Sequence, residues 1–222
     1  NNSVENIEYE LTNAIYKLIL NNKPKIAFLD GHNGLNELQT ADITHSLGQI
    51  KGSLSEYFHV ERINIKEIKI NENNNPSIEK QLKRINKYQA LIIANPSVKF
   101  TELDKFLIDQ YIMNGGKTVW FLDGVEIDMD SLRGNVPFYM GTPMDLNLTD
   151  LLFKYGVRVN YDLIMDFQAD KIPIVVGYQG DVPQQQLLPW FYHPIIIPKN
   201  NQSIVKNIDG IKCSFISSLD TI

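Results

Sequence analysis

Short apolar runs, separated by amphipathic stretches, dominate the first 125 residues of the chain. Runs that are apolar throughout are typical of strands that are buried on both faces of a parallel sheet. Helices then cover both faces of such a sheet and are joined to the strands by right-handed crossovers. The pattern therefore predicts a doubly wound, mostly parallel α/β sheet over residues 25–125. The predicted strands are KIAFL (25–29), the alternating VERINI (60–65), ALIIA (90–94) and TVWFL (118–122).

Apolar residues at helical spacing fill the segments between these strands. Thr101 and Asp104 have the spacing of a capping box at the start of the last of these helices, and Gly115 and Gly116 follow its end. We interpret residues 1–22 as an N-terminal helix or linker and residues 23–222 as one α/β domain. The predicted helices cover residues 5–21, 37–57, 77–87 and 101–114, with Gly48 and Gly52 weakening the second by about 1 kcal/mol each.

The pattern changes in the C-terminal part, from about residue 134 to 222, which we expect to be more β-rich and to contain more loops. The stretch GDVPQQQLLPWFYHP (180–194), rich in Gln, Pro and aromatic residues, is interpreted as a long loop. A helix is predicted over 145–156, and strands over 157–166, 172–178, 194–198 and 211–216.

Three aromatic residues inside that stretch, Trp190, Phe191 and Tyr192, have two possible roles. They fill the core beneath the loop, or they form an exposed patch that docks a partner, because aromatic residues dominate the energetics of protein interfaces. Exposure cannot be derived from a sequence, so both interpretations remain open.

Composition and charge narrow the class of protein. The chain has 222 residues and a net charge of −5, and its Lys and Arg residues are not gathered in one block, so we expect no nucleic-acid partner. The single cysteine, Cys213, excludes an internal disulfide framework. No run of about 18 apolar residues is present that would span a membrane. The four histidines are scattered without the spacing of metal ligands, so we expect neither a metal nor a cofactor.

Polar residues follow three of the predicted strands at the point where each strand ends. Ligands of an open parallel sheet bind at the carboxyl ends of its strands, so we expect these residues to lie on one edge and to line a binding cleft. The candidate cleft residues are Asp30, Gly31, His32 and Asn33 after the first strand, Asn95 and Ser97 after the third, and Asp123 after the fourth.

A hydrolase would use Ser97 as the nucleophile and His32 as the base, with Asp30 or Asp123 orienting the imidazole. A nucleophile elbow needs small neighbours because its turn is strained, whereas Ser97 lies between Pro96 and a valine. The chain also has no Gly-rich phosphate-binding motif. We therefore predict no catalytic residue and interpret Asp30 to Asn33 as a turn that lines a vestigial or binding cleft. A small-molecule or glycan binding module, or a cryptic hydrolase, is the alternative.

Several phrases, taken in order, resemble a known family. They are YELTNAIYKLILNNKPKIAFLDGHNGLNE, ALIIANPSVKFTELDKFLIDQYIMNGGKTVWFLDG, LTDLLFKYGVRVNYDLIMD and SIVKNIDGIKCSFISSLDTI. Together they are similar to the ABC-transporter auxiliary domain, as found in the soluble part of the gliding-motility protein GldG. The family loop usually reads Gly-His-Gly-Glu, whereas this chain has Gly31-His32-Asn33-Gly34 and its acid only at Glu37.

The resemblance implies a membrane-anchored accessory subunit that works with an ABC permease subunit and a separate ATPase subunit. Its soluble domain would lie on the periplasmic side of the cytoplasmic membrane and would meet the membrane only through segments outside these 222 residues. The implied fold is that of class I glutamine amidotransferases, which is flavodoxin-like, without the catalytic cysteine. The implied role is non-catalytic binding of a protein or of an unknown ligand.

Overall fold

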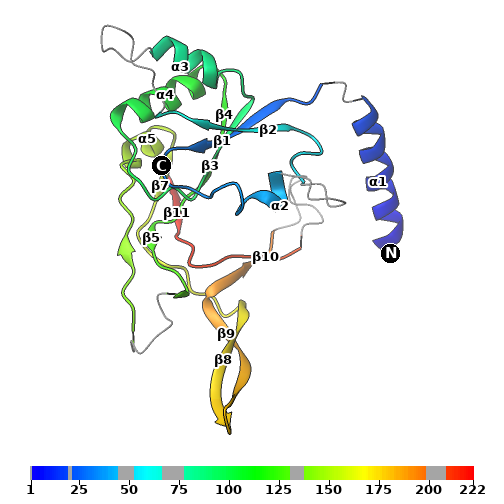
Figure 1. The fold of residues 1–222 in the computed structure, drawn as a ribbon, viewed down its shortest axis with the longest axis vertical. Coiled ribbons are helices and arrows are strands. Elements are labelled where there is room, and N and C mark those ends of the chain that lie inside the picture. The colour runs from blue at the N-terminus through cyan, green and yellow to red at the C-terminus, as the bar shows by residue number, and fades with distance from the viewer. Residues whose placement is uncertain (1, 20–21, 45–52, 67–77, 131–137, 199–208) are drawn as a thin grey trace. The chain divides into compact units, whose positions relative to one another are not determined.

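The chain folds into two compact units in the computed structural model, which describes residues 2–19, 22–44, 53–66, 78–130, 138–198 and 209–222. The first unit consists of Asn1–Leu122 with Leu146–Leu151, and the second consists of Asp123–Asp145 with Leu152–Ile222. Figure 1 shows the path of the chain through its helices and strands.

A four-stranded parallel sheet forms the centre of the first unit. Its strand order is β2-β1-β3-β4, and every neighbouring pair is parallel, so the predicted parallel sheet is confirmed. The central strands β1 and β3 each contain four consecutive buried apolar residues, and Phe28 and Ile92 from these two strands lie in one buried cluster. The strands are β1 (Lys25–Asp30), β2 (His59–Asn64), β3 (Ala90–Ala94) and β4 (Lys117–Phe121).

Among the described residues, four helices lie entirely in the first unit. Figure 1 shows α3 and α4 together on one side of the sheet and α2 on the other, as in a doubly wound sheet. α4 begins with the predicted capping box, in which Thr101 and Asp104 bond reciprocally. The helices are α1 (Asn2–Ile19), α2 (Ala41–Thr44), α3 (Ile78–Ile85) and α4 (Glu102–Met113).

The long helix predicted over 37–57 is wrong. Among the described residues of this segment only Ala41–Thr44 is helical, and Gly48 and Gly52 lie outside them. Asn36 and Gln39 exchange two side-chain to backbone bonds, of 2.9 and 3.0 Å, which close a turn just before α2. The Leu54 N–H donates to the Ile43 carbonyl at 3.0 Å, whereas a continuous helix would hold these two residues about 16 Å apart, so residues 37–57 do not form one helix.

The second unit is built from antiparallel pairs, which confirms the β-rich character predicted for the C-terminal part. The pairs are β5 with β6, β7 with β11, and β9 with both β8 and β10. The strands are β5 (Val125–Glu126), β6 (Thr142–Pro143), β7 (Val157–Val159), β8 (Ala169–Gln179), β9 (Val182–Ile196), β10 (Ile211–Lys212) and β11 (Leu219–Thr221).

Several boundaries predicted for this part are wrong. The helix predicted from residue 145 is α5 (Thr149–Lys154), because Asn147 just before it has a left-handed backbone, with φ of 58°. The strand predicted over 157–166 ends at Val159, where its pairing with β11 ends. The strand predicted over 211–216 is the two-residue β10.

The interpretation of residues 180–194 as a loop is also wrong, because they form most of β9. Gly180 and Asp181 make a two-residue turn between paired Gln179 and Val182, and Gly180 takes φ of +64°. A glycine at this position is what a type II′ hairpin turn requires. Of the three prolines inside β9, Pro183 and Pro189 lie in its outer part, which among the described residues pairs with β8 alone and so has an open edge that tolerates them.

No helix among the described residues is long and apolar enough to cross a membrane.

Candidate functional site

The loop that follows β1 lies across the carboxyl end of β3. The Leu35 N–H donates to the carbonyl of Ala94, the last residue of β3, at 2.9 Å. Gly34 allows this approach, because a Cβ at its position would lie 2.5 Å from the same carbonyl oxygen. The edge of the sheet where a ligand was expected is therefore occupied at β3 by the chain's own backbone.

His32 is buried within this loop and joins it to the loop that follows β3. Its side chain is only 2% exposed, and its ring stacks on Phe100 with the centroids 3.7 Å apart. Its Nε2 is hydrogen-bonded to the Asp104 carboxylate at 3.1 Å. Its backbone carbonyl accepts from the N–H groups of Ser97 and Val98, at 3.0 and 3.1 Å. His32 thus holds two loops and the start of α4 together.

The Asp104 carboxylate bonds to His32 and also takes part in the capping box of α4. The carboxylate oxygen that meets His32 also accepts from the Thr101 N–H at 2.9 Å, which completes the capping box of α4. Burial alone would raise the pKa of Asp104, but hydrogen bonds from His32 and Thr101 outweigh it and hold the pKa below its usual value. The ionised carboxylate is therefore the acceptor in this buried pair.

The accessible polar pair at the strand ends is Asn33 with Ser97, both of which are exposed. The Asn33 side-chain amide donates to the Ser97 hydroxyl at 2.7 Å, and that hydroxyl donates to the Asn33 carbonyl at 3.2 Å. Asn33 and Asn95 both have a left-handed backbone, with φ of 51° and 48°, a conformation that asparagine tolerates better than most residues. The Ser97 hydroxyl is thus bonded to Asn33, and the imidazole of His32 is bonded to Asp104.

This geometry differs from the triad considered for a hydrolase. The carboxylate that is hydrogen-bonded to His32 and orients it belongs to Asp104, and not to Asp30 or Asp123. Gly31, inside the stretch interpreted as a turn, has φ of +101°, a backbone conformation that favours glycine. Asp123 follows β4 by two residues and belongs to the second unit.

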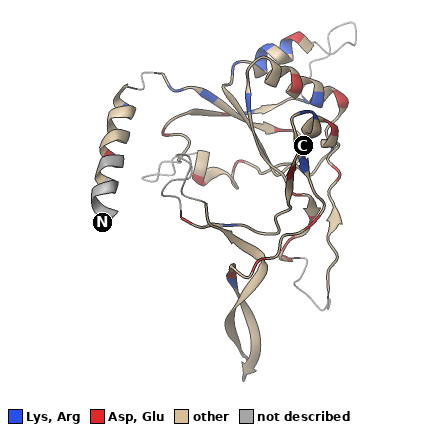
Figure 2. Cartoon of the chain, turned by 180° about the vertical axis from the view of Figure 1, so that it is seen from behind, with Lys and Arg blue, Asp and Glu red and all other residues tan. Residues whose placement is uncertain are grey.

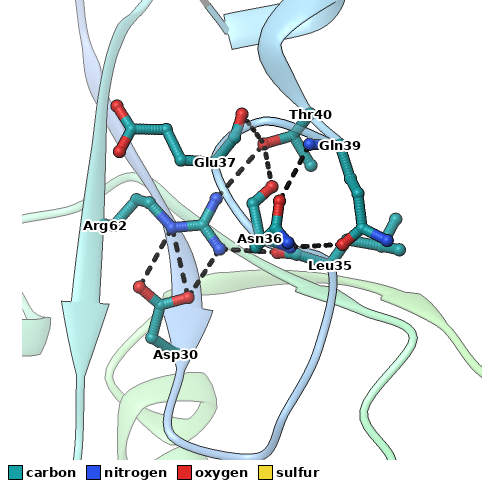
Figure 3. Close-up of polar contacts among 7 residues, drawn as sticks. All are labelled: Asp30, Leu35, Asn36, Glu37, Gln39, Thr40 and Arg62. Atoms are coloured by element: carbon teal, nitrogen blue, oxygen red, sulfur yellow. Dashed lines mark hydrogen bonds and ion pairs between the residues drawn. The ribbon is translucent and has the colours of Figure 1, made fainter.

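Asp30 is bound by Arg62 of the neighbouring strand β2, as Figure 3 shows. The guanidinium Nε and one terminal nitrogen donate to the Asp30 carboxylate at 3.0 and 2.6 Å. The same terminal nitrogen donates to the Leu35 carbonyl at 2.6 Å, and the other donates to the Thr40 hydroxyl at 3.2 Å. Arg62 therefore clamps both ends of the loop that carries His32 (Figure 3).

A shallow pocket of about 260 Å³ lies beside Arg62 and is lined by Glu37, Thr44, Val60, Glu61 and Arg62. Arg62 already binds Asp30 and Leu35, and Glu61 binds Lys25 and Tyr88. Tyr88 is consequently held neutral, because burial and its bond to Glu61 raise its pKa to about 12. The charged groups of the lining are thus engaged in bonds within the protein.

The aromatic triplet lies on β9, close to the base of the β8–β9 hairpin. Trp190 and Tyr192 are half-buried, with ring centroids 6.0 Å apart, and Tyr192 stacks on Phe215 at 6.3 Å. Phe191 is 40% exposed and meets the ring of Phe167 at 5.5 Å. Among the residues that the structure describes, no three His, Cys, Asp or Glu side chains are arranged to hold a metal ion.

Sequence reasoning missed Asp104 as the partner of His32, and it missed Arg62 altogether. Asp104 had been assigned to helix capping alone, and it lies 72 positions from His32. Arg62 lies in the alternating stretch VERINI beside two other polar residues, so the pattern alone does not distinguish it from a charge that faces solvent.

The fold and the site define a mixed α/β domain whose parallel sheet is closed at β3 by its own loop and which continues into a unit of antiparallel strands. The chain belongs to the family described as ABC-type uncharacterized transport system, whose family model matches residues 23–222.

Two further similarities accompany the family match. The chain is 27% identical over 224 residues to an uncharacterized protein of Borreliella burgdorferi, covering 99% of this chain and 38% of that relative. The chain thus corresponds to well under half of the relative's length. It is also similar to a solved structure of the mmIFT52 N-terminal domain, with a TM-score of 0.53 and 15% identity, over 89% of this chain and 68% of that one. The second likeness concerns the fold alone.

Proposed function

We propose that this chain is a non-catalytic accessory domain of an ABC-type transport system and that it acts by binding a protein subunit of that system. One observation supports this role above the others: three of the polar side chains expected to bind or react with a ligand are bonded to other side chains of the domain. His32 is buried against Asp104, Asp30 is clamped by Arg62, and Ser97 is paired with Asn33. With its strand-end groups engaged, the domain has to meet its partner through another surface.

The partners in this proposal are the permease subunit and the ATPase subunit of the same system. Co-expression of the full gene product with both subunits, followed by affinity purification, tests the association. Recovery of the two subunits in fixed proportion is the expected result. Failure of both to co-purify under mild detergent conditions would refute the proposal.

A hydrolase is the competing function, and Ser97→Ala is the decisive variant for it. This substitution removes the candidate nucleophile and only an exposed hydroxyl pair, so the fold should be retained. We expect wild type and Ser97→Ala to be equally inactive on ester and amide substrates. Activity that is present in the wild type and lost in Ser97→Ala would show that the domain is an enzyme.

The finer parts of the family resemblance belong to the same proposal. The strand order β2-β1-β3-β4 matches the first strands of flavodoxin-like sheets, which supports an amidotransferase-like fold. Asn95, with its left-handed backbone, stands at the strand end where such folds carry their nucleophile.

We propose that the domain works on the periplasmic side of the cytoplasmic membrane, as expected for a GldG-like subunit. Fusions of the full gene product to alkaline phosphatase and to a cytoplasmic fluorescent protein distinguish the two sides.

A further inference from the structure

The β8–β9 hairpin extends as a two-stranded arm from the rest of its unit, as Figure 1 shows. We define the arm as residues 172–188, the outer part of the ladder. β10 pairs with β9 only at Ile195 and Ile196, and within the described chain β8 has no other strand partner than β9. Both edges of the arm are therefore open, and an isolated two-stranded ribbon is only marginally stable in water.

The arm is almost free of charge. Residues 172–188 contain one charged side chain, Asp181 at the turn, whereas the chain's average of 21% would place about three or four there. Figure 2 shows the outer hairpin almost entirely in tan. Charged side chains are what normally protects an exposed strand edge from association, so this stretch lacks the usual protection.

Apolar side chains are exposed on both faces of the arm. Cross-strand partners share a face, so Val175 and Tyr178 of β8 lie on the same face as Leu187, whereas Val182 lies on the opposite face. Val175 is 44% exposed, and Val176, at the bulge between Val175 and Gly177, is 57% exposed. Tyr178, Val182 and Leu187 are exposed by 73%, 62% and 62%. A partner that covered one face alone would leave the apolar side chains of the other face in water.

The dimensions of the arm distinguish a partner that covers one of its faces from a partner that encloses both faces. Eight residues of strand span about 26 Å, and two strands are about 10 Å wide, so one face offers about 260 Å². A dimer through single faces would bury only about 520 Å² in total, which is less than a specific interface needs. A groove that encloses both faces would bury about 1,000 Å², which reaches the lower limit of specific interfaces.

A lipid environment fits the arm less well than a protein groove. In hydrocarbon the unpaired N–H and C=O groups along both open edges would have no hydrogen-bond partners. The Gln184–Gln186 run adds three exposed amides on the same arm. A protein groove offers both apolar walls and backbone or side-chain groups that pair with the edges.

We infer that the β8–β9 arm inserts into an uncharged, apolar groove of the permease subunit and is the element by which this domain docks in its transport system. This inference rests on the proposed function and specifies the surface that carries it out. The aromatic triplet at the base of the arm would then line the rim of the same interface.

The test uses a photo-crosslinking amino acid at Tyr178 in the full gene product, co-expressed with the permease and ATPase subunits. The matched control places it at Phe106, an apolar α4 residue that is 45% exposed on the other unit. We expect Tyr178 to crosslink to the permease, with a yield at least tenfold above that of Phe106.

The other outcomes separate the two proposals. If the complex co-purifies but Tyr178 labels only lipid, a second copy of the chain or nothing, the docking inference is overturned and the accessory function stands. If neither subunit co-purifies, both are overturned.

A second variant excludes misfolding as the cause of any loss. Val176→Asp places a charge on the arm, and we expect it to lower recovery of the permease at least tenfold with an unchanged melting temperature. Phe106→Asp is the control and should leave recovery unchanged. Equal recovery with both variants would overturn the inference.

Discussion

Asp104 offers the sharpest test of how the strand-end edge is held closed. Replacing it with alanine removes one carboxylate that serves two donors, the Nε2 of His32 and the N–H of Thr101. Both the Asp104 and His32 side chains are almost completely buried, with 3% and 2% exposure, so water cannot replace the lost acceptor without opening the site.

The expected cost follows from these two bonds. Loss of a helix N-terminal capping partner costs about 1 kcal/mol. A buried donor left without an acceptor costs about 1–3 kcal/mol. We therefore expect Asp104→Ala to lower the free energy of unfolding by about 2–4 kcal/mol, which is among the larger effects of single substitutions.

Urea unfolding of wild type, Asp104→Ala, His32→Ala and the double variant measures both the cost and the coupling between the residues. We expect a coupling free energy of about 1–2 kcal/mol, because each residue loses its partner in the other's variant. Thr101→Ala is the matched control, since it removes the reciprocal capping bond and leaves the His32–Asp104 pair in place. A cost below about 0.5 kcal/mol for Asp104→Ala, or additivity in the double variant, would refute the idea that this pair closes the edge.

The pKa of Asp104 also predicts the direction in which the stability of the fold changes with pH. The pKa of Asp104 is lower in the folded protein than in the unfolded chain, where it is about 4. Its contribution to stability is therefore complete above pH 4 and is lost as the pH falls through the folded-state pKa. We expect the stability difference between wild type and Asp104→Asn to be full at pH 7 and to shrink below pH 4. A difference that grows on acidification would contradict the assignment.

Two further substitutions test the loop and its clamp. Gly34→Ala should cost about 1–3 kcal/mol in urea unfolding, because the new methyl group meets the Ala94 carbonyl at 2.5 Å. Gly177→Ala, with nothing within 4 Å of its Cβ, should be neutral, and equal effects at both positions would refute the close approach. Arg62→Lys should cost about 1–2 kcal/mol, since a lysine cannot make the forked contact with Asp30 and Leu35. Arg158→Lys, on an exposed side chain, should change stability by less than 0.5 kcal/mol, and a similar loss in both would show that Arg62 is not a clamp.

The parallel sheet was predictable because its signals are local. A strand buried on both faces has to be apolar at consecutive positions, and ALIIA occupies β3 from its first residue to its last. The capping box of α4 needs two residues three positions apart, and the sequence shows both. The long helix over 37–57 failed because periodicity did not reveal that the Leu54 N–H bonds to the Ile43 carbonyl, which a continuous helix does not allow.

For the β8–β9 hairpin, the sequence contained a correct turn signal, but other residues nearby favoured a loop. Gly180-Asp181 between two apolar runs is a typical sequence for a two-residue hairpin turn, and the structure forms that turn here. Three prolines at positions 183, 189 and 194, together with the Gln run, favoured a loop instead. Prolines are compatible with a strand whose neighbour is missing on one side, and whether a strand has that neighbour is a property of the assembled sheet.

By itself the sequence determined the parallel sheet, the strand-end position of Asp30-Gly31-His32-Asn33 and the absence of a nucleophile elbow. Only the tertiary structure decided what those residues do. It pairs His32 with Asp104 across 72 positions and Asp30 with Arg62 across 32, and it lays Leu35 over the end of β3. Periodicity and capping arise from neighbours along the chain, whereas these partners meet because parallel strands bring distant segments to the same edge. A cleft at that edge stays a prediction, and at β3 the structure bonds the last carbonyl of the strand to the Leu35 N–H of the chain's own loop.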